Sequence, residues 1–217
     1  MSYLLRIVLP DRPGALGAVA TALGGVGADI LSLDVIERSP GQATDDLVVE
    51  LPPDKLADSL VSAAATVPGV RVESIRPYAG QIDPHRELEL LDALAGRPDD
   101  ALMLLADGVS RIFRAGWALV LEAPADGVCT VLASGGAPPE ITEISAPWWP
   151  AEPARMLDVE EAWVPPVWAR IGTELAVAPL GGNALLVGRP ALRWVPSELV
   201  RLHHLAAIAA TVAATAR

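Results

Sequence analysis

The chain has 217 residues, 52% of them apolar, and a formal net charge of −11. This length suits one large or two small domains, and the apolar content excludes a wholly disordered chain. A strongly acidic chain lacks the basic side chains that bind phosphate backbones and anionic lipids, which argues against nucleic-acid and membrane binding. Cys129 is the only cysteine, so a disulfide scaffold is excluded.

We expect a cytosolic location. The start of the sequence is apolar, but Asp11, Arg12 and Pro13 interrupt it before it resembles a secretory signal. The uncharged stretch 13–28 is shorter than the ~20 apolar residues that cross a bilayer. Lys55 is the single lysine among 16 basic residues, a usage typical of GC-rich bacterial genomes.

The first 78 residues predict the element order β-α-β-β-α-β. The apolar spacing predicts strands over residues 3–9, 30–37, 46–51 and 70–76, with helices over residues 13–23 and 56–67. Asp11 is expected to cap the first helix, and Leu31, Leu33 and Val35 to share one face of the second strand. This order is typical of the ferredoxin-like α+β fold, whose small core commonly gains stability by pairing.

A second α+β domain is predicted over residues 87–217, after a linker at 79–86. Its helices are expected at residues 87–95, 101–113 and 196–217, and its strands at 117–122, 128–134, 173–179 and 184–188. Turn residues at 124–127 and 181–183 predict two hairpins. Residues 135–168, rich in proline and tryptophan, are expected to be irregular.

A motif at the first strand-to-helix turn resembles an ACT domain. It consists of the sequence DRPGAL at 11–16, after an apolar strand, and of VGADI at 26–30. The resemblance covers about residues 1–78 and implies a regulatory module, most often for amino acids, that usually forms homodimers. The residues that it places at the ligand are Asp11, Arg12, Pro13, Gly14, Ala15, Leu16, Asp29 and Ile30. The family commonly has Asn where this chain has Asp29.

The turn at Gly14 also suits a ligand on physical grounds. Gly14 has no side chain to block approach to the backbone, and free N–H groups at a helix N-terminus attract a carboxylate. The carboxylate of Asp29 is a candidate acceptor for the ammonium group of a ligand. The competing interpretation is that the turn only caps the helix and packs closely. Both interpretations stay open at this point.

The C-terminal part is more weakly similar to a GAF domain, in residues 174–188 and in the alanine-rich final helix. The similarity implies an antiparallel sheet flanked by helices, a fold that often holds small molecules in a pocket under a cap. Tryptophans gather in the irregular segment, at Trp148, Trp149, Trp163 and Trp168. These tryptophans could form an aromatic cap over a second pocket or a docking surface. The alternative, which we favour, is that they pack into the core of the second domain.

The sequence gives no set of residues that predicts catalysis or a metal site. His203 and His204 are adjacent, without the spacing of a metal-binding pair. Cys129 falls in an apolar strand and is expected to be a structural thiol. Asp45 and Asp46 point to opposite sides of a strand, and we interpret such acidic pairs as solvated surface. We therefore expect no enzymatic activity and no cofactor.

We expect a non-catalytic, homodimeric sensor or regulator that binds an amino acid or another small carboxylate. The alternative is an interaction protein without a ligand, which dimerises and docks on a partner enzyme or signalling protein. An RNA-recognition module shares the element order of the first domain. It would carry aromatic side chains on its sheet, and the predicted strand 46–51 has none.

Overall fold

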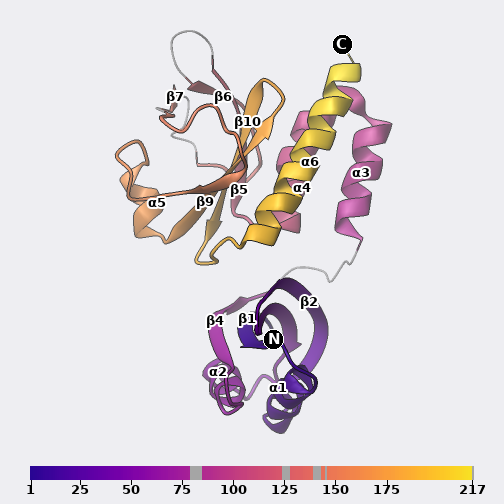
Figure 1. The fold of residues 1–217 in the computed structure, drawn as a ribbon, viewed down its shortest axis with the longest axis vertical. Coiled ribbons are helices and arrows are strands. Elements are labelled where there is room, and N and C mark those ends of the chain that lie inside the picture. Colours follow the sequence, from indigo (N-terminus) through magenta and orange to yellow (C-terminus); the bar gives the residue numbers. More distant parts are fainter. Residues whose placement is uncertain (79–84, 124–127, 139–142, 145, 217) are drawn as a thin grey trace. The chain divides into compact units, whose positions relative to one another are not determined.

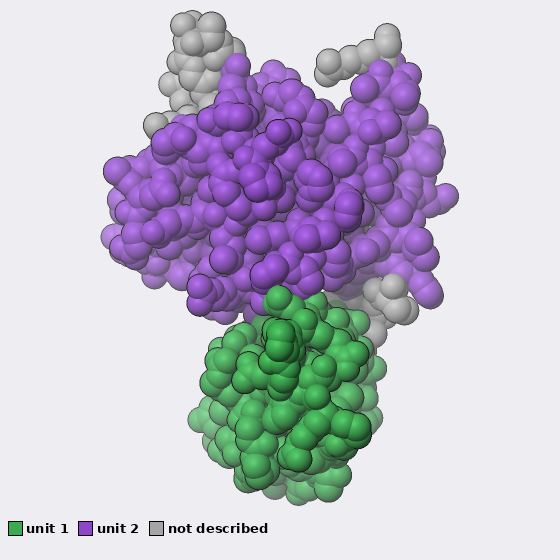
Figure 2. Space-filling model, in the orientation of Figure 1, with its two compact units in different colours: residues 1–83 green, residues 84–217 purple. Residues whose placement is uncertain are grey.

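The chain forms two compact units, residues 1–83 and 84–217 (Figures 1 and 2). The computed structural model describes residues 1–78, 85–123, 128–138, 143–144 and 146–216. Each unit has a hydrophobic core of its own. The predicted linker at 79–86 lies mostly outside the described residues, so its boundaries stay a prediction. Helix α3 begins at Arg86, one residue before its expected start.

Unit 1 has the predicted element order. It consists of β1 (Ser2–Pro10), α1 (Ala15–Gly25), β2 (Asp29–Ser39), β3 (Gln42–Glu50), α2 (Asp58–Ala65) and β4 (Arg71–Pro77). All strand pairs are antiparallel, and the order in the sheet is β2-β3-β1-β4. The ferredoxin-like prediction is therefore confirmed. Leu56 is 77% exposed and lies before α2 rather than within it.

The core of unit 1 lies between one face of the sheet and the two helices. Leu5 and Ile7 of β1 and Leu47 of β3 are fully buried there, together with Val19 of α1. These apolar side chains recur at every second strand position, as expected for one face of a sheet. The helices and the sheet therefore enclose one apolar layer.

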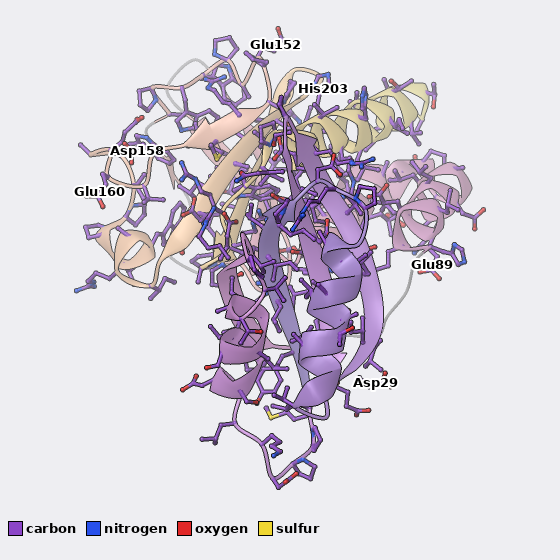
Figure 3. The ribbon with its side chains drawn as sticks, turned by 60° about the horizontal axis from the view of Figure 1, so that its bottom comes forward. Asp29, Glu89, Glu152, Asp158, Glu160 and His203 are labelled. Atoms are coloured by element: carbon purple, nitrogen blue, oxygen red, sulfur yellow. The ribbon has the colours of Figure 1, made fainter. Side chains whose placement is uncertain are left out.

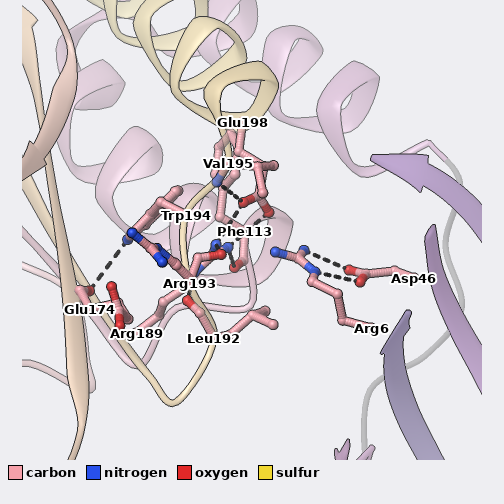
Figure 4. A network of polar contacts seen from close by, with 10 residues as sticks. All are labelled: Arg6, Asp46, Phe113, Glu174, Arg189, Leu192, Arg193, Trp194, Val195 and Glu198. Carbon is pink, nitrogen blue, oxygen red and sulfur yellow. Dashed lines mark hydrogen bonds and ion pairs between the residues drawn. The ribbon is translucent and has the colours of Figure 1, made fainter. Parts of the chain in front are cut away.

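On the opposite face of this sheet, Arg6 and Asp46 lie directly across β1 and β3. The guanidinium group of Arg6 donates two hydrogen bonds to the Asp46 carboxylate, at 2.7 and 2.9 Å (Figure 4). Such a two-point ion pair fixes the geometry of both side chains.

The prediction that Leu31, Leu33 and Val35 share one face of the second strand is wrong for Leu31. Leu33 packs against the core, whereas Leu31 is 40% and Val35 54% exposed. The register of β2 against β3 shifts between Ile30 and Ser32 and again between Val35 and Glu37. The first shift leaves Leu31 as an extra residue in β2, so Leu31 does not share the face of Leu33. Val35 lies opposite Asp45 and does share the face of Leu33, and it is exposed on this edge strand. The result is an edge strand with two exposed apolar side chains.

Unit 2 is built on a six-stranded antiparallel sheet in the order β7-β6-β5-β10-β9-β8. Its elements are α3 (Arg86–Gly96), a 3-10 turn (Pro98–Asp100), α4 (Ala101–Ile112), β5 (Trp117–Glu122), β6 (Val128–Ala133), β7 (Glu143–Ile144), β8 (Arg155–Leu157), α5 (Pro166–Arg170), β9 (Thr173–Leu180), β10 (Asn183–Pro190) and α6 (Pro196–Thr215). The α+β prediction for this part, an antiparallel sheet flanked by helices, is confirmed.

The segment between the two hairpins of unit 2 is more regular than predicted. The segment 135–168 is not wholly irregular, because it contains β7, β8 and the start of α5. Of the two predicted hairpins, the pairing of β9 with β10 is confirmed. Strands β5 and β6 also pair antiparallel, but the turn at 124–127 lies outside the described residues.

The second sheet is covered on both faces. Helices α3, α4 and α6 lie along one face, where Val120, Val187 and Leu202 are fully buried (Figure 1). The other face packs against the chain between β7 and β9. There the indole of Trp117 lies across Gly188, so close that a Cβ added to Gly188 would lie 2.2 Å from the ring. A sheet buried on both sides explains why its strands are apolar throughout.

Candidate functional site

The turn between β1 and α1 is held by short backbone hydrogen bonds. The N–H of Arg12 donates to the carbonyl of Pro10 at 2.9 Å, and the N–H of Ala15 donates to Arg12 at 3.2 Å. Gly14 immediately precedes α1 and has φ of +86°, a left-handed conformation that favours glycine. These contacts fix the turn and set the start of the helix.

The expectation that Asp11 caps α1 is wrong. No side chain caps this helix, and the residue at the capping position is Gly14. Instead, the Asp11 carboxylate accepts a hydrogen bond from the guanidinium group of Arg38 in β2 at 2.6 Å. A charge-assisted hydrogen bond of this kind is stronger than one to a neutral amide, and it raises the pKa of Arg38.

Three backbone amides around the start of α1 are consequently without an acceptor. Among the described residues, the N–H groups of Gly14, Leu16 and Gly17 make no hydrogen bond. Residues 11–14 are exposed, and a Cβ added to Gly14 would meet no atom within 4 Å. Three N–H groups at a helix N-terminus beside open space make a site that favours an anion.

Asp45 approaches the same end of the unit from β3. It lies directly opposite Ile7, whose side chain is in the core, so Asp45 lies on the sheet face that the helices cover. Asp45 is 3% exposed, and in the part of the chain that the structure describes its Oδ1 atom has no hydrogen-bond partner. The interpretation of Asp45 and Asp46 as solvated surface is wrong, because Asp46 is fully buried and pairs with Arg6.

The electrostatic surroundings of Asp45 connect it with the turn. Burial raises the pKa of Asp45, the Asp46 carboxylate raises it further, and Asp11 raises it as well. The positive charge of Arg38 acts in the opposite direction. Asp45 is therefore a buried carboxyl group whose pKa responds to the charges of both Asp11 and Arg38. Sequence reasoning missed it, although an acidic residue between the apolar positions Ala43 and Leu47 was a usable signal.

Asp29 and Ile30 do not join the turn within one chain. Asp29 lies opposite Glu50, at the end of the sheet where Ser2 begins β1, whereas the turn follows Pro10 at the other end. Helix α1, with 11 residues, separates the two ends by ~16 Å. Asp29 is exposed there (Figure 3), and Ile30 packs against the core.

The tryptophans of the predicted second pocket pack against the sheet of unit 2. Trp168 is 1% and Trp148 6% exposed, whereas Trp149 and Trp163 are partly buried against the same cluster. The ring centroids of Trp148 and Trp163 are 5.7 Å apart. These residues thus form part of the core, the interpretation that we favoured. In the described part of unit 2, the indole N–H groups of Trp148 and Trp168 find no acceptor.

The remaining reactive side chains do not form a site. His203 (Figure 3) is partly buried. His204 is exposed, and the two ring centroids are 5.7 Å apart. Within the described ranges, no cluster of three or more His, Cys, Asp or Glu side chains is arranged to hold a metal ion. Cys129 lies in β6, as predicted, and its side chain is outside the description. None of the described helices has both the length and the apolar character needed to cross a bilayer.

Comparison with known families agrees with the geometry of unit 1. Residues 3–69 match the family model of the ACT domain. Unit 1 is similar to an ACT domain over these residues. The match covers β1 to the end of the turn after α2, and it includes the whole Gly14 turn and both ends of the sheet. No curated protein matches the chain.

Solved structures similar to the chain include GAF domains. The GAF domain/HD domain protein from Geobacter sulfurreducens is 14% identical with a TM-score of 0.45, over 58% of this chain and 96% of that one. The GAF domain of an Acinetobacter phosphoenolpyruvate-protein phosphotransferase is 12% identical with a TM-score of 0.39, over 62% and 96%. Free methionine-R-sulfoxide reductase from Neisseria meningitidis is 16% identical with a TM-score of 0.48, over 65% and 99%. All three scores are below 0.5, so they carry no conclusion about what this chain binds.

Proposed function

We propose that this chain is a non-catalytic, homodimeric sensor whose ACT domain binds an amino acid at the Gly14 turn. The observation that carries the proposal is the uncapped N-terminus of α1. An ACT domain is a regulatory small-molecule-binding module, and here the backbone amides at its first turn lie beside open space. A ligand carboxylate supplies the acceptor that the protein does not provide.

A homodimer fits the distribution of the candidate residues. Gly14 and Asp29 lie at opposite ends of the sheet in one chain, so they meet only if two chains lie side by side in opposite directions. Edge strand β2, with Leu31 and Val35 exposed, is suited to such a pairing. Antiparallel β2 strands would bring Asp29 of the partner subunit to the end of the sheet that holds Gly14.

Isothermal titration calorimetry of the full chain with each of the twenty amino acids tests the proposal. We expect one amino acid, or a few of similar shape, to bind at a single site per chain. Hydrogen exchange should then slow in the peptides that contain residues 11–17, because bound amides are protected. Binding that protects only peptides of unit 2 would contradict the assignment to the ACT domain.

The alternative, an interaction protein without a ligand, is supported by the exposed apolar side chains of edge strand β2. Leu31 and Val35 make this edge suitable for a protein partner as well as for a second copy. If the folded chain binds none of the twenty amino acids and still forms dimers, the interaction function is the better explanation.

A further inference from the structure

Helix α6 carries exposed apolar side chains on the side opposite its core contacts. The helix lies beside α3 and α4 on one face of the sheet of unit 2 (Figure 1). Its buried apolar side chains are those of Leu202, Leu205, Ala206 and Ala209. On the other side, Val200 is 55% and Ile208 41% exposed. A helix that packs on a domain turns mainly polar and charged side chains to solvent, so this outer face departs from the usual pattern.

Most of α6 is also without charged side chains. Residues 202–216 contain no Asp, Glu, Lys or Arg. The adjacent helices differ, because Glu89 and Asp92 of α3 and Asp107 of α4 are exposed acidic residues. Two chains that each have a net charge of −11 repel one another, so they approach most readily where the facing surfaces are uncharged. The outer face of α6 meets this condition.

The exposed positions of α6 follow the spacing of a coiled-coil seam. They include Val200, His204, Ala207, Thr211 and Ala214, at alternating intervals of four and three residues. An average interval of about 3.5 residues keeps a line of side chains facing a second helix. The short side chains of Ala207 and Ala214 let the axes of two helices lie close together. The spacing therefore indicates another helix as the occupant of this face.

We propose that α6 pairs along this seam with α6 of a second copy of the chain. An uncharged, largely apolar seam is complementary to itself, as a two-fold symmetric contact requires. Contacts of a single helix belong to the small interfaces, below about 1,200 Å², so this contact strengthens the dimer that β2 forms and does not hold one alone. The inference rests on the homodimer of the proposed function and not on its ligand.

Cysteine cross-linking of the full chain at pH 8 tests the position of the contact. Ala207 is the midpoint of the seam, between Val200 and Ala214, so its two copies meet whether the helices run parallel or antiparallel. Ala207→Cys is combined with Cys129→Ser, which leaves one thiol in the chain. Ala65→Cys in the same background is the matched control.

The control position resembles Ala207 in its surroundings. Ala65 is also an exposed alanine on a helix, α2, but it lies in unit 1. We expect mild oxidation to produce the covalent dimer of the Ala207→Cys chain about tenfold faster than that of the Ala65→Cys chain. A thiol held beside its copy reacts at a high effective concentration, whereas one outside the contact depends on collisions.

The Ala207→Glu variant measures the same contact by its effect on affinity and retains Cys129. Sedimentation equilibrium gives the dimer dissociation constants of the wild type, Ala207→Glu and the control Ala65→Glu. Two carboxylates at the midpoint of the seam repel each other, so we expect the dissociation constant to rise about tenfold in Ala207→Glu. It should not change in Ala65→Glu.

The opposite results would overturn the pairing of α6. Equal cross-linking rates for Ala207→Cys and Ala65→Cys, or equal dissociation constants for Ala207→Glu and the wild type, would leave the β2 dimer in place. The face would then belong to a helix of another protein. A wild-type chain that is monomeric throughout would overturn the homodimer of the proposed function, and this inference with it. Circular dichroism shows whether each variant folds, and if Ala207→Glu does not, the cross-linking rates decide.

Discussion

Arg189 and Glu198 form a two-point ion pair inside unit 2 (Figure 4). The guanidinium group of Arg189 donates to both carboxylate oxygens of Glu198, at 2.8 and 2.6 Å, and both side chains are buried. Arg189 also donates to the carbonyl of Leu192 and lies 3.9 Å above the ring of Trp194. Glu198 in turn accepts from the backbone N–H of Val195, at the start of α6. The pair thus joins the end of β10 to the final helix.

We predict that Glu198→Gln strongly destabilises unit 2. The substitution keeps the size of the side chain but leaves the buried charge of Arg189 without its counter-charge, which costs about 3 kcal/mol. All six tryptophans lie in unit 2, so urea unfolding followed by tryptophan fluorescence measures this unit alone. The midpoint should fall clearly below that of the wild type.

The exposed ion pair between Glu87 and Arg201 supplies the control for this measurement. Glu87→Gln removes a charge of the same kind in the same unit, but solvent screens the pair, and we expect less than about 1 kcal/mol. If Glu198→Gln and Glu87→Gln lowered the free energy of unfolding equally, burial of the Arg189–Glu198 ion pair would make no difference to stability.

The β-α-β-β-α-β order of unit 1 was predictable because its signals are local. Alternating apolar residues such as Leu5 and Ile7 mark a strand, and helical spacing marks α1. The exposure of Leu31 and Val35 was not predictable in this way. The exposure of Leu31 depends on a register shift in the pairing of β2 with β3, and that of Val35 depends on the position of β2 at the edge of the sheet. Both arise from contacts between strands and not from the sequence of β2 alone.

One part of the candidate site could likewise be predicted from local sequence, and another part could not. The motif around Gly14 is a continuous stretch of sequence, so it could be found directly. That Asp11 pairs with Arg38 instead of capping α1, and that Asp45 is buried, both depend on which strand the helix crosses. Tertiary packing decides such contacts, and a pattern of neighbouring residues does not contain that information.

The buried carboxylate of Asp45 leads to a prediction about pH. Burial raises its pKa in the folded chain above the value in the unfolded chain. The folded state then binds more protons across this interval, so the contribution of Asp45 to stability falls as the pH rises through it. The Asp45→Asn variant has no such group. The free energy of unfolding of the variant minus that of the wild type should therefore be larger at pH 7 than at pH 4.

Urea unfolding followed by far-ultraviolet circular dichroism at both pH values measures this difference for the full chain. Other carboxylates titrate in the wild type and the variant alike, so they cancel in the comparison. A difference between the two proteins that does not change with pH would contradict the raised pKa of Asp45.

The Gly14→Ala variant tests whether the open space at the turn is where the ligand lies. At φ of +86° an alanine is strained by about 1 kcal/mol, and its methyl group enters space that no protein atom occupies. We expect a modest loss of stability and at least a tenfold loss of amino-acid affinity by titration calorimetry. Gly172→Ala is the matched control, because Gly172 also has a positive φ and open surroundings but lies in unit 2. Undiminished affinity in Gly14→Ala would move the site away from this turn.

Pairing of two chains through β2 predicts a specific effect of Val35→Lys. Val35 is 54% exposed on this edge strand, so a lysine is tolerated in the single chain but places two like charges in a symmetric interface. Light scattering coupled to size-exclusion chromatography should show a dimer for the wild type and a monomer for Val35→Lys. Leu56→Lys, which adds the same charge at a 77% exposed position outside the sheet, should remain dimeric. A Val35→Lys chain that stays dimeric would place the interface elsewhere, and Asp29 would then have no route to the Gly14 turn through β2.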